Sequence, residues 1–183
     1  MDWTLLFARM QRAARLDPTL YDEVEHDESA LSQAVLVVVI AAVASALASL
    51  PDSAERGSRH LGIIPEVVSM LINWGVWSYL TFVLGTRFFG GRATPGELFR
   101  SLGFAMSPGA LSILGFIPCL GGLVRAAVLV WVLLAGVLAV REALDCDNAA
   151  ALGTVIASGV AMLVVFFVQL ALSGALGLTV RLL

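Results

Sequence analysis

The residues of this chain that are most able to do chemistry are few, and they stand at the edges of long apolar stretches. Glu66, Glu97, Arg100 and Arg125 each lie near the end of a stretch, and the interiors carry no Asp, Glu, His, Arg or Lys. An ionisable group at the centre of a bilayer costs about 2.5 kcal/mol or more, so one is retained there only for a function. The pattern therefore disfavours enzymes and proton-coupled transporters. We expect no catalytic residue and no cofactor.

The histidines and cysteines are also placed unfavourably for metal or disulfide chemistry. His26 and His60 flank the first apolar stretch, and Cys119 and Cys146 lie in successive loops. Successive loops lie on opposite sides of a bilayer, so the two thiols are separated by far more than the distance that a disulfide spans. The sequence predicts no disulfide and no metal site built on the histidines.

Three polar or helix-breaking residues remain inside the apolar stretches: Asn73, Pro108 and Gln169. An asparagine at membrane depth needs a hydrogen-bond partner, so Asn73 is expected to face other helices. Such contacts serve helix packing, but the same residues, together with Ser107, could line a polar path for a substrate. Both interpretations stay open.

Composition decides the class of protein. Of 183 residues, 59% are hydrophobic and 14% are charged. In a soluble domain about half of the residues are hydrophobic and about a quarter are charged. The long apolar stretches predict an all-α polytopic membrane protein with five transmembrane helices, near residues 34–50, 63–85, 98–117, 120–140 and 151–179. We expect a cytoplasmic segment at 1–32 and a five-helix domain at 33–183. The net charge of −3, without a basic patch, argues against a nucleic-acid partner.

The third apolar stretch has the best-defined beginning. Thr94, Pro95 and Glu97 form the pattern of a capping box with proline in the first turn. Pro108 falls in the middle of this stretch and predicts a kink, beside Gly109, which allows close helix packing. The kink either shapes packing or forms a hinge or binding notch.

Residues 3–16 form an amphipathic pattern. Trp3, Phe7 and Met10 share one helical face, and Arg9, Arg12 and Arg15 share another. This predicts an interfacial helix whose arginines face anionic headgroups, or else a helix packed on the rest of the protein. An acidic run follows, made up of Asp22, Glu23, Glu25, Asp27 and Glu28. It is either a solvated face, a docking site for a basic partner, or a set of partners for the arginines.

Arginine placement predicts the orientation. With five spans, Arg9, Arg12, Arg15, Arg87, Arg92, Arg100 and Arg141 fall on the side of the N-terminus, against Arg56, Arg59, Arg125 and Arg181 on the other. The excess favours a cytoplasmic N-terminus and an external C-terminus. The last stretch carries a ladder of small residues, Gly153, Ala157 and Ala161, which is typical of close helix contacts.

The segments GTRFFGGRATPGELFRSLGFAMSPGAL (85–111), LGFIPCLGGLV (114–124) and WVLLAGVLAVREALDCDNAAA (131–151) resemble a bacterial member of the YIP family of Rab/Ypt-interacting-type integral membrane proteins. Gly103, Phe104 and Pro108 resemble the family's Gly-Tyr-to-Pro signature, with Phe104 in place of tyrosine. The resemblance implies five spans, a cytoplasmic N-terminus and no enzyme activity. Eukaryotic members bind prenylated GTPases in vesicle traffic, a role that does not carry over to a bacterium.

Three functions are compatible with these features. The first is a non-catalytic scaffold or accessory subunit of a bacterial cytoplasmic (inner) membrane, which binds the lipid bilayer and other membrane subunits or itself. The second is a small oligomeric channel or carrier. The third is a lipid-binding or bilayer-shaping protein that uses the N-terminal amphipathic helix.

Overall fold

The structure is a computed structural model that describes residues 2–56, 63–117 and 120–181, without the side chains of residues 51–56 and 169–181. The described residues form helices and connections, which confirms the all-α prediction. The helices are α1 (Trp3–Ala14), α2 (Pro18–His26), α3 (Ala30–Arg56), α4 (Ile63–Phe88), α5 (Pro95–Ala105), the 3₁₀ helix η1 (Ser107–Phe116), α6 (Gly121–Ala143) and α7 (Asn148–Arg181).

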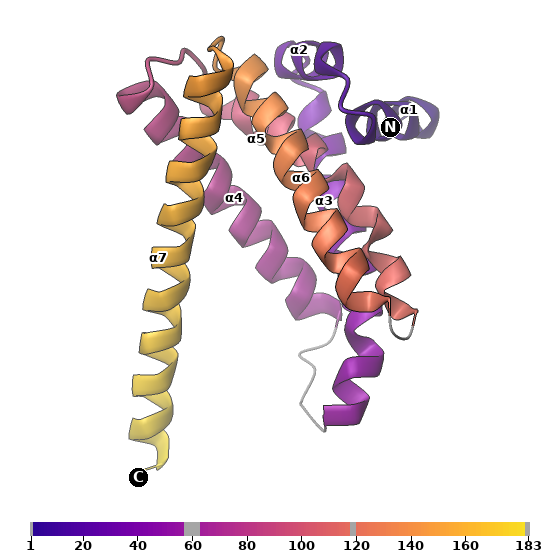
Figure 1. Ribbon diagram of the computed structural model, residues 1–183, viewed down its shortest axis with the longest axis vertical. Coiled ribbons are helices and arrows are strands. Elements are labelled where there is room, and N and C mark those ends of the chain that lie inside the picture. Colours follow the sequence, from indigo (N-terminus) through magenta and orange to yellow (C-terminus); the bar gives the residue numbers. More distant parts are fainter. Residues whose placement is uncertain (1, 57–62, 118–119, 182–183) are drawn as a thin grey trace.

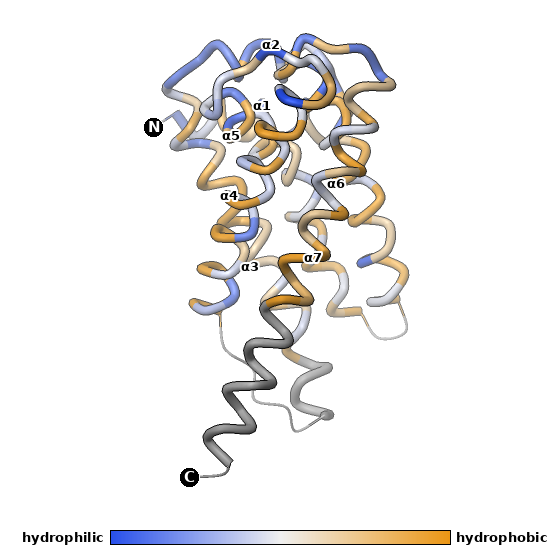
Figure 2. Tube along the Cα trace, turned by 90° about the vertical axis from the view of Figure 1, so that its left-hand side faces the viewer, coloured by the Kyte–Doolittle hydropathy of each residue, from blue (hydrophilic) through white to orange (hydrophobic). Residues whose placement is uncertain are grey.

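Polar and apolar parts separate along the long axis of the molecule. Helices α1 and α2 lie across one end, beside the connections 89–94 and 144–147, and we call this end the N-terminal face (Figure 1). The long helices extend away from it. Figure 2 shows hydrophilic residues gathered at the N-terminal face and hydrophobic residues along the helices below it. This polarity is typical of a helical membrane protein.

Four of the described helices are long and apolar enough to cross a membrane, over residues 30–50, 63–88, 121–143 and 148–168. They correspond to the first, second, fourth and fifth predicted spans. Four of the five predicted transmembrane helices are therefore present as long α-helices. The third predicted span is not one α-helix, because α5 ends at Ala105 and the chain continues as the ten-residue 3₁₀ helix η1.

Pro108 explains the change of helix type, while the start of α5 follows the sequence pattern. Thr94 and Glu97 form the expected capping box. At the other end of α5, Pro108 lacks an N–H, and its ring would collide with the carbonyl of Phe104 in a continuing α-helix. The Ser107 hydroxyl donates to that carbonyl oxygen at 2.6 Å, and the Gly109 N–H donates to Met106 O at 2.8 Å.

The α5–η1 segment packs against α3 through pairs of alanine and glycine. A Cβ atom added to Gly103 would lie 2.6 Å from Ala34 Cβ, and one added to Gly109 would lie 2.8 Å from Ala41 Cβ. A third pair continues the series, since a Cβ at Gly115 would lie 3.5 Å from Ala48 Cβ. Small residues let two helix backbones approach this closely.

The spacing of the pairs matches the two helix types. The alanines recur every seven residues on α3, which is ~10.5 Å at 1.5 Å per residue. Their glycine partners recur every six residues. A 3₁₀ helix rises about 2.0 Å per residue, and this larger rise compensates for the smaller number of residues between the glycines. The 3₁₀ helix therefore keeps the glycines in register with the alanines.

The buried core lies near the N-terminal face, where α1, α2, α3, α5 and α6 meet. Its largest fully buried side chains are Tyr21, Phe104, Leu6, Leu20, Leu98, Leu102 and Leu144. The three residues of the predicted signature have separate structural places: Gly103 contacts α3, Phe104 fills the core, and Pro108 is buried where η1 begins.

Replacing Gly103 with alanine is expected to destabilise the protein, because the new Cβ overlaps Ala34. Overpacking costs about 1–3 kcal/mol, which exceeds the gain of about 1 kcal/mol that alanine brings within a helix. Thermal unfolding in detergent would measure the effect, and Ala34→Gly should restore part of the loss. Gly122→Ala is the control, because a Cβ there meets nothing within 4 Å. Equal effects at both positions would contradict the close packing.

Candidate functional site

The N-terminal face is held together by Arg9. Its side chain is 6% exposed. The guanidinium donates to Glu23 Oε1 at 2.9 Å, to Asp27 Oδ2 at 2.8 Å and to Gln33 Oε1 at 3.0 Å. These partners come from α2, from the turn after it and from α3, so one arginine joins three elements. Buried arginines with several charge-assisted bonds fix geometry strongly.

Arg12 extends this arrangement. It bonds to Asp17 Oδ2 at 2.9 Å and to Glu23 Oε2, and it also donates to the Thr19 hydroxyl. The Arg12 guanidinium beside Asp17 holds the pKa of that carboxyl below its usual value. Arg9 and Arg12 are both paired with carboxylates of the chain, which favours the alternative of a helix packed on the rest of the protein. The alternative that the acidic run pairs with the arginines holds for these two residues.

The apolar residues Trp3, Phe7 and Met10 of α1 are more exposed than Arg9. Trp3 and Phe7 are 56% and 58% exposed, Arg15 is exposed, and Met10 is half-buried. Phe7 and Met10 line a shallow groove of about 580 Å³ together with Ser107 and Pro108 of η1. Trp131 of α6 fixes the end of α1, since its Nε1 donates to Ala14 O at 2.8 Å. Contact of α1 with a membrane surface stays a prediction.

Arg100 fixes α2, a role that the sequence analysis missed. The side chain is 8% exposed, and its guanidinium donates to Val24 O at 3.0 Å and to Glu25 O. Cations near the C-terminal carbonyls of a helix are favourable because of the helix dipole. The position of Arg100 at the start of a span was visible in the sequence. Its partner lies 76 residues away, and local patterns do not reveal such a contact.

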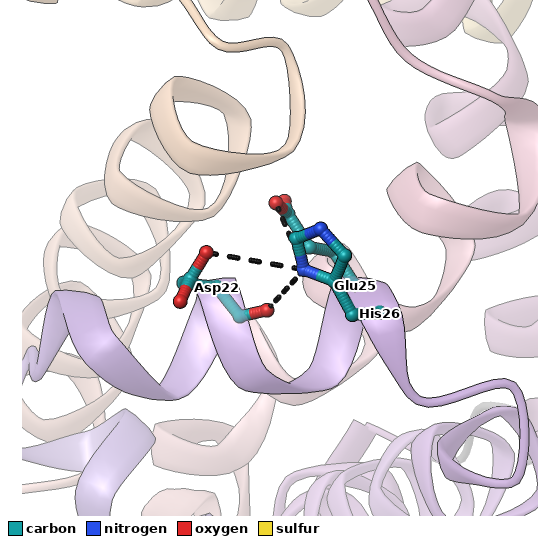
Figure 3. Close-up of side chains that lie close together, drawn as sticks. All are labelled: Asp22, Glu25 and His26. Carbon is teal, nitrogen blue, oxygen red and sulfur yellow. Dashed lines mark hydrogen bonds and ion pairs between the residues drawn. The ribbon is translucent and has the colours of Figure 1, made fainter.

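Asp22, Glu25 and His26 converge on one face of α2 (Figure 3). His26 Nδ1 lies 3.6 Å from Glu25 Oε1 and 3.9 Å from Asp22 Oδ1, and 2.8 Å from the main-chain oxygen of Asp22. Glu25 is 8% exposed, and its Oε2 has no hydrogen-bond partner among the described residues. Burial raises the pKa of the Glu25 carboxyl to about 7; His26 opposes this shift, and the carboxylates of Asp145, Asp22 and Glu97 add to it.

This cluster differs from what the sequence led us to expect. The prediction of no metal site considered a pair of histidines, whereas the cluster combines one histidine with two carboxylates of the same helix. The spacing of Asp22, Glu25 and His26, three and four residues apart, places side chains together on a helix and could have revealed it. The burial of Glu25 could not be seen, because it arises from packing against α5 and α6.

The polar residues of the apolar stretches do not share one path. Asn73 is exposed rather than buried among helices, and it lines a groove of about 350 Å³ between α4, α6 and α7, with Trp74, Trp77 and Gly159. Ser107 and Pro108 line the separate groove beneath α1. The side chain of Gln169 lies outside the described residues. The described parts of the predicted path are therefore split between two grooves.

The small-residue ladder of α7 lies at the edge of its packing face. Gly153, Ala157 and Ala161 are half-buried, and a Cβ at Gly153 would lie 2.5 Å from Phe89 Cε1. The buried residues of α7 are instead Ala151, Thr154, Val155 and Ser158. Trp77 of α4 donates to the Ser158 hydroxyl at 3.2 Å. Gly153 thus accommodates an aromatic ring rather than another small residue.

We expect the stability of the metal-free protein to fall as pH rises from about 4.5 to about 7. The pKa of Glu25 is raised from an ordinary 4.5 to about 7 in the folded state. Between these two pH values Glu25 is ionised in the unfolded state but still protonated in the folded state. Ionisation therefore lowers the free energy of the unfolded state relative to the folded state as pH rises. Glu25→Gln mimics the neutral acid. It should raise the unfolding temperature at pH 8 and leave it nearly unchanged at pH 4.5, measured with a chelator present.

The matched control is Glu28→Gln, which removes an exposed carboxylate from the same segment. It should show no such pH dependence. If Glu25→Gln raised the unfolding temperature equally at both pH values, ionisation of the buried carboxyl group would be excluded as the cause of the rise.

Comparison with known proteins identifies the family to which this chain belongs. No curated protein and no solved structure matched the chain. The family model described as Yip1 domain matches residues 17–169, which include α2 and all the long helices up to the last described side chains of α7. The match covers most of the chain, and the protein therefore belongs to the Yip1 domain family of membrane proteins.

Proposed function

We propose that the protein is a non-catalytic membrane scaffold or accessory subunit that binds a partner through its N-terminal face. The observation that carries this proposal is the fixed position of α2. Arg9 and Arg100 anchor that helix to α1, α3 and α5, while Asp22 on the helix and Glu28 just after it stay exposed. A rigid element that presents exposed charge suits recognition, because little conformational entropy is lost on binding.

The charge of this surface indicates the chemistry of the partner. Residues 2–28 hold three arginines, Arg9, Arg12 and Arg15, against seven carboxylates, Asp2, Asp17, Asp22, Glu23, Glu25, Asp27 and Glu28. Arg9 and Arg12 are used inside the network. Asp22 and Glu28 are exposed, and Asp145 lies exposed in the neighbouring connection. Such a surface attracts a basic segment and repels an anionic one.

In this proposal the chain crosses the membrane five times. The α5–η1 segment supplies the crossing that the four long helices leave out. Eleven α-helical residues and ten 3₁₀ residues together span ~36 Å, against about 30 Å of hydrocarbon. The excess of arginines then places the N-terminal face in the cytoplasm and the C-terminus outside. The membrane is the cytoplasmic (inner) membrane of a bacterium.

Thiol labelling of intact cells tests this orientation. Cys146 belongs to the connection at the N-terminal face, and it is half-buried. In a Cys119→Ser variant, a membrane-impermeant reagent should label Cys146 only after permeabilisation. A Cys146→Ser variant, which keeps Cys119, should react without it. The reverse pattern would place the N-terminal face outside.

The mass and composition of the particle isolated in mild detergent test the scaffold function. We expect a defined complex with a partner that carries a basic segment, and its retention should fall as salt rises. Glu28→Arg should lower the retained partner. Glu66→Arg, the same change of charge at the opposite end of the molecule, should not. A monomer or homo-oligomer that keeps its composition in every variant would exclude the proposal.

Lipid binding is the second candidate, favoured by the groove between α4, α6 and α7. The lining of the groove is mostly apolar, and it also includes the polar side chains of Asn73 and Glu66. Such a lining fits a lipid, which has an apolar acyl chain and a polar headgroup. The same preparation distinguishes this function, because it would contain stoichiometric phospholipid and no protein partner. Gly159→Leu should then release the lipid, since a Cβ at Gly159 meets nothing within 4 Å and the side chain would fill the groove.

A further inference from the structure

The cluster on α2 has the geometry of a small cation site. One potential ligand atom each from Asp22, Glu25 and His26 lies within 4.8 Å of the others. Figure 3 shows the three side chains close together, with dashed lines that join His26 to Asp22 and Glu25. Asp22 stands one helical turn before Glu25 and His26, so the three side chains can surround a common point after small rotations.

A second observation is the burial of the Glu25 carboxyl group in this cluster. The Glu25 side chain is 91% buried, and its Oε2 has no hydrogen-bond partner among the described residues. A buried polar atom without a partner is costly, and a buried carboxylate more so. Arg100 lies nearby but donates to main-chain oxygens of α2, including Glu25 O, rather than to the carboxylate.

We propose that Asp22, Glu25 and His26 bind a divalent transition-metal cation, with Zn²⁺ as the best fit. Two carboxylate oxygens and one imidazole nitrogen form a ligand set that Zn²⁺ accepts, whereas Mg²⁺ and Ca²⁺ prefer oxygen ligands alone. The main-chain oxygen of Asp22 orients the imidazole of His26, because it lies 2.8 Å from Nδ1, the same nitrogen that faces both carboxylates. In this proposal Nδ1 gives up that contact when it binds the cation.

The exposure of the cluster shapes the coordination. The side chains of Asp22 and His26 are 70% and 76% exposed, while that of Glu25 is 9% exposed. The cation would therefore be held from below by a buried carboxylate and stay open to solvent above. Its open positions would take water or a ligand atom from another molecule. The three ligands all come from this chain, so metal binding can be measured in the absence of the partner proposed above.

Metal titration of the full-length protein in detergent tests the proposal. The protein is stripped with a chelator, and Zn²⁺ binding is followed by calorimetry, with Co²⁺ absorption as a spectroscopic probe. Thiols bind both ions, so every sample carries Cys119→Ser and Cys146→Ser. One equivalent of Zn²⁺ should bind, and excess Mg²⁺ should not displace it. The Co²⁺ spectrum should show nitrogen and oxygen ligation.

Two variants and one control locate the site. Glu25→Gln and His26→Gln should each weaken Zn²⁺ binding about a hundredfold or more, since even partners outside the ligand shell contribute about 10–100-fold. Glu28→Gln removes a nearby exposed charge and should leave binding unchanged. Circular dichroism verifies that each variant is folded. Unchanged affinity in Glu25→Gln and His26→Gln, equal losses in all three variants, or displacement of Zn²⁺ by Mg²⁺ would each overturn the proposal.

Discussion

The close approach of α3 to the α5–η1 segment is the contact on which the rest of the structure depends. Alanines on α3 face glycines at Gly103, Gly109 and Gly115, and there is no room for a further methyl group at the first two. In lipid, helices gain little from the hydrophobic effect, so association relies on close packing. This contact positions α5, and α5 carries Arg100 to the end of α2. The N-terminal face is thus built on a contact between small residues.

Local sequence signals predicted the beginnings of helices well. The capping box at Thr94 forms as the pattern indicates. Asp17, which precedes Pro18, also caps a helix, since its side chain accepts a hydrogen bond from Thr19 N. Four of the five apolar stretches became long helices because length and hydrophobicity determine such helices locally. The effect of Pro108 was predicted as a kink, yet the chain adopts a ten-residue 3₁₀ helix. Runs of that length are uncommon, and the register of the α3 contact that favours this one is not a local property.

The candidate site was harder to predict because it depends on burial. The amphipathic pattern of α1 placed Arg9 on a polar face, but Arg9 itself is covered by α2 and the start of α3. The residues of the acidic run also differ in their surroundings. Glu23 and Asp27 pair with Arg9, Glu25 is buried with one carboxylate oxygen that has no hydrogen-bond partner among the described residues, and Glu28 is exposed. Adjacent carboxylates therefore differ in role according to tertiary contacts. A sequence pattern identifies the charges, whereas packing decides which of them remain available.

Two of the contacts that attach the N-terminal helices to the long helices are made to main-chain atoms of α1 and α2. Arg100 bonds to carbonyl oxygens at the end of α2, and Trp131 bonds to the carbonyl oxygen of Ala14 at the end of α1. Every residue type supplies a carbonyl oxygen, so these anchors do not restrict the side chains of α1 and α2. In evolutionary terms, the residues on the outer surfaces of the two helices can change while the contacts that attach the helices to the long helices are kept. Related chains could then acquire different partners without rebuilding the membrane-embedded part.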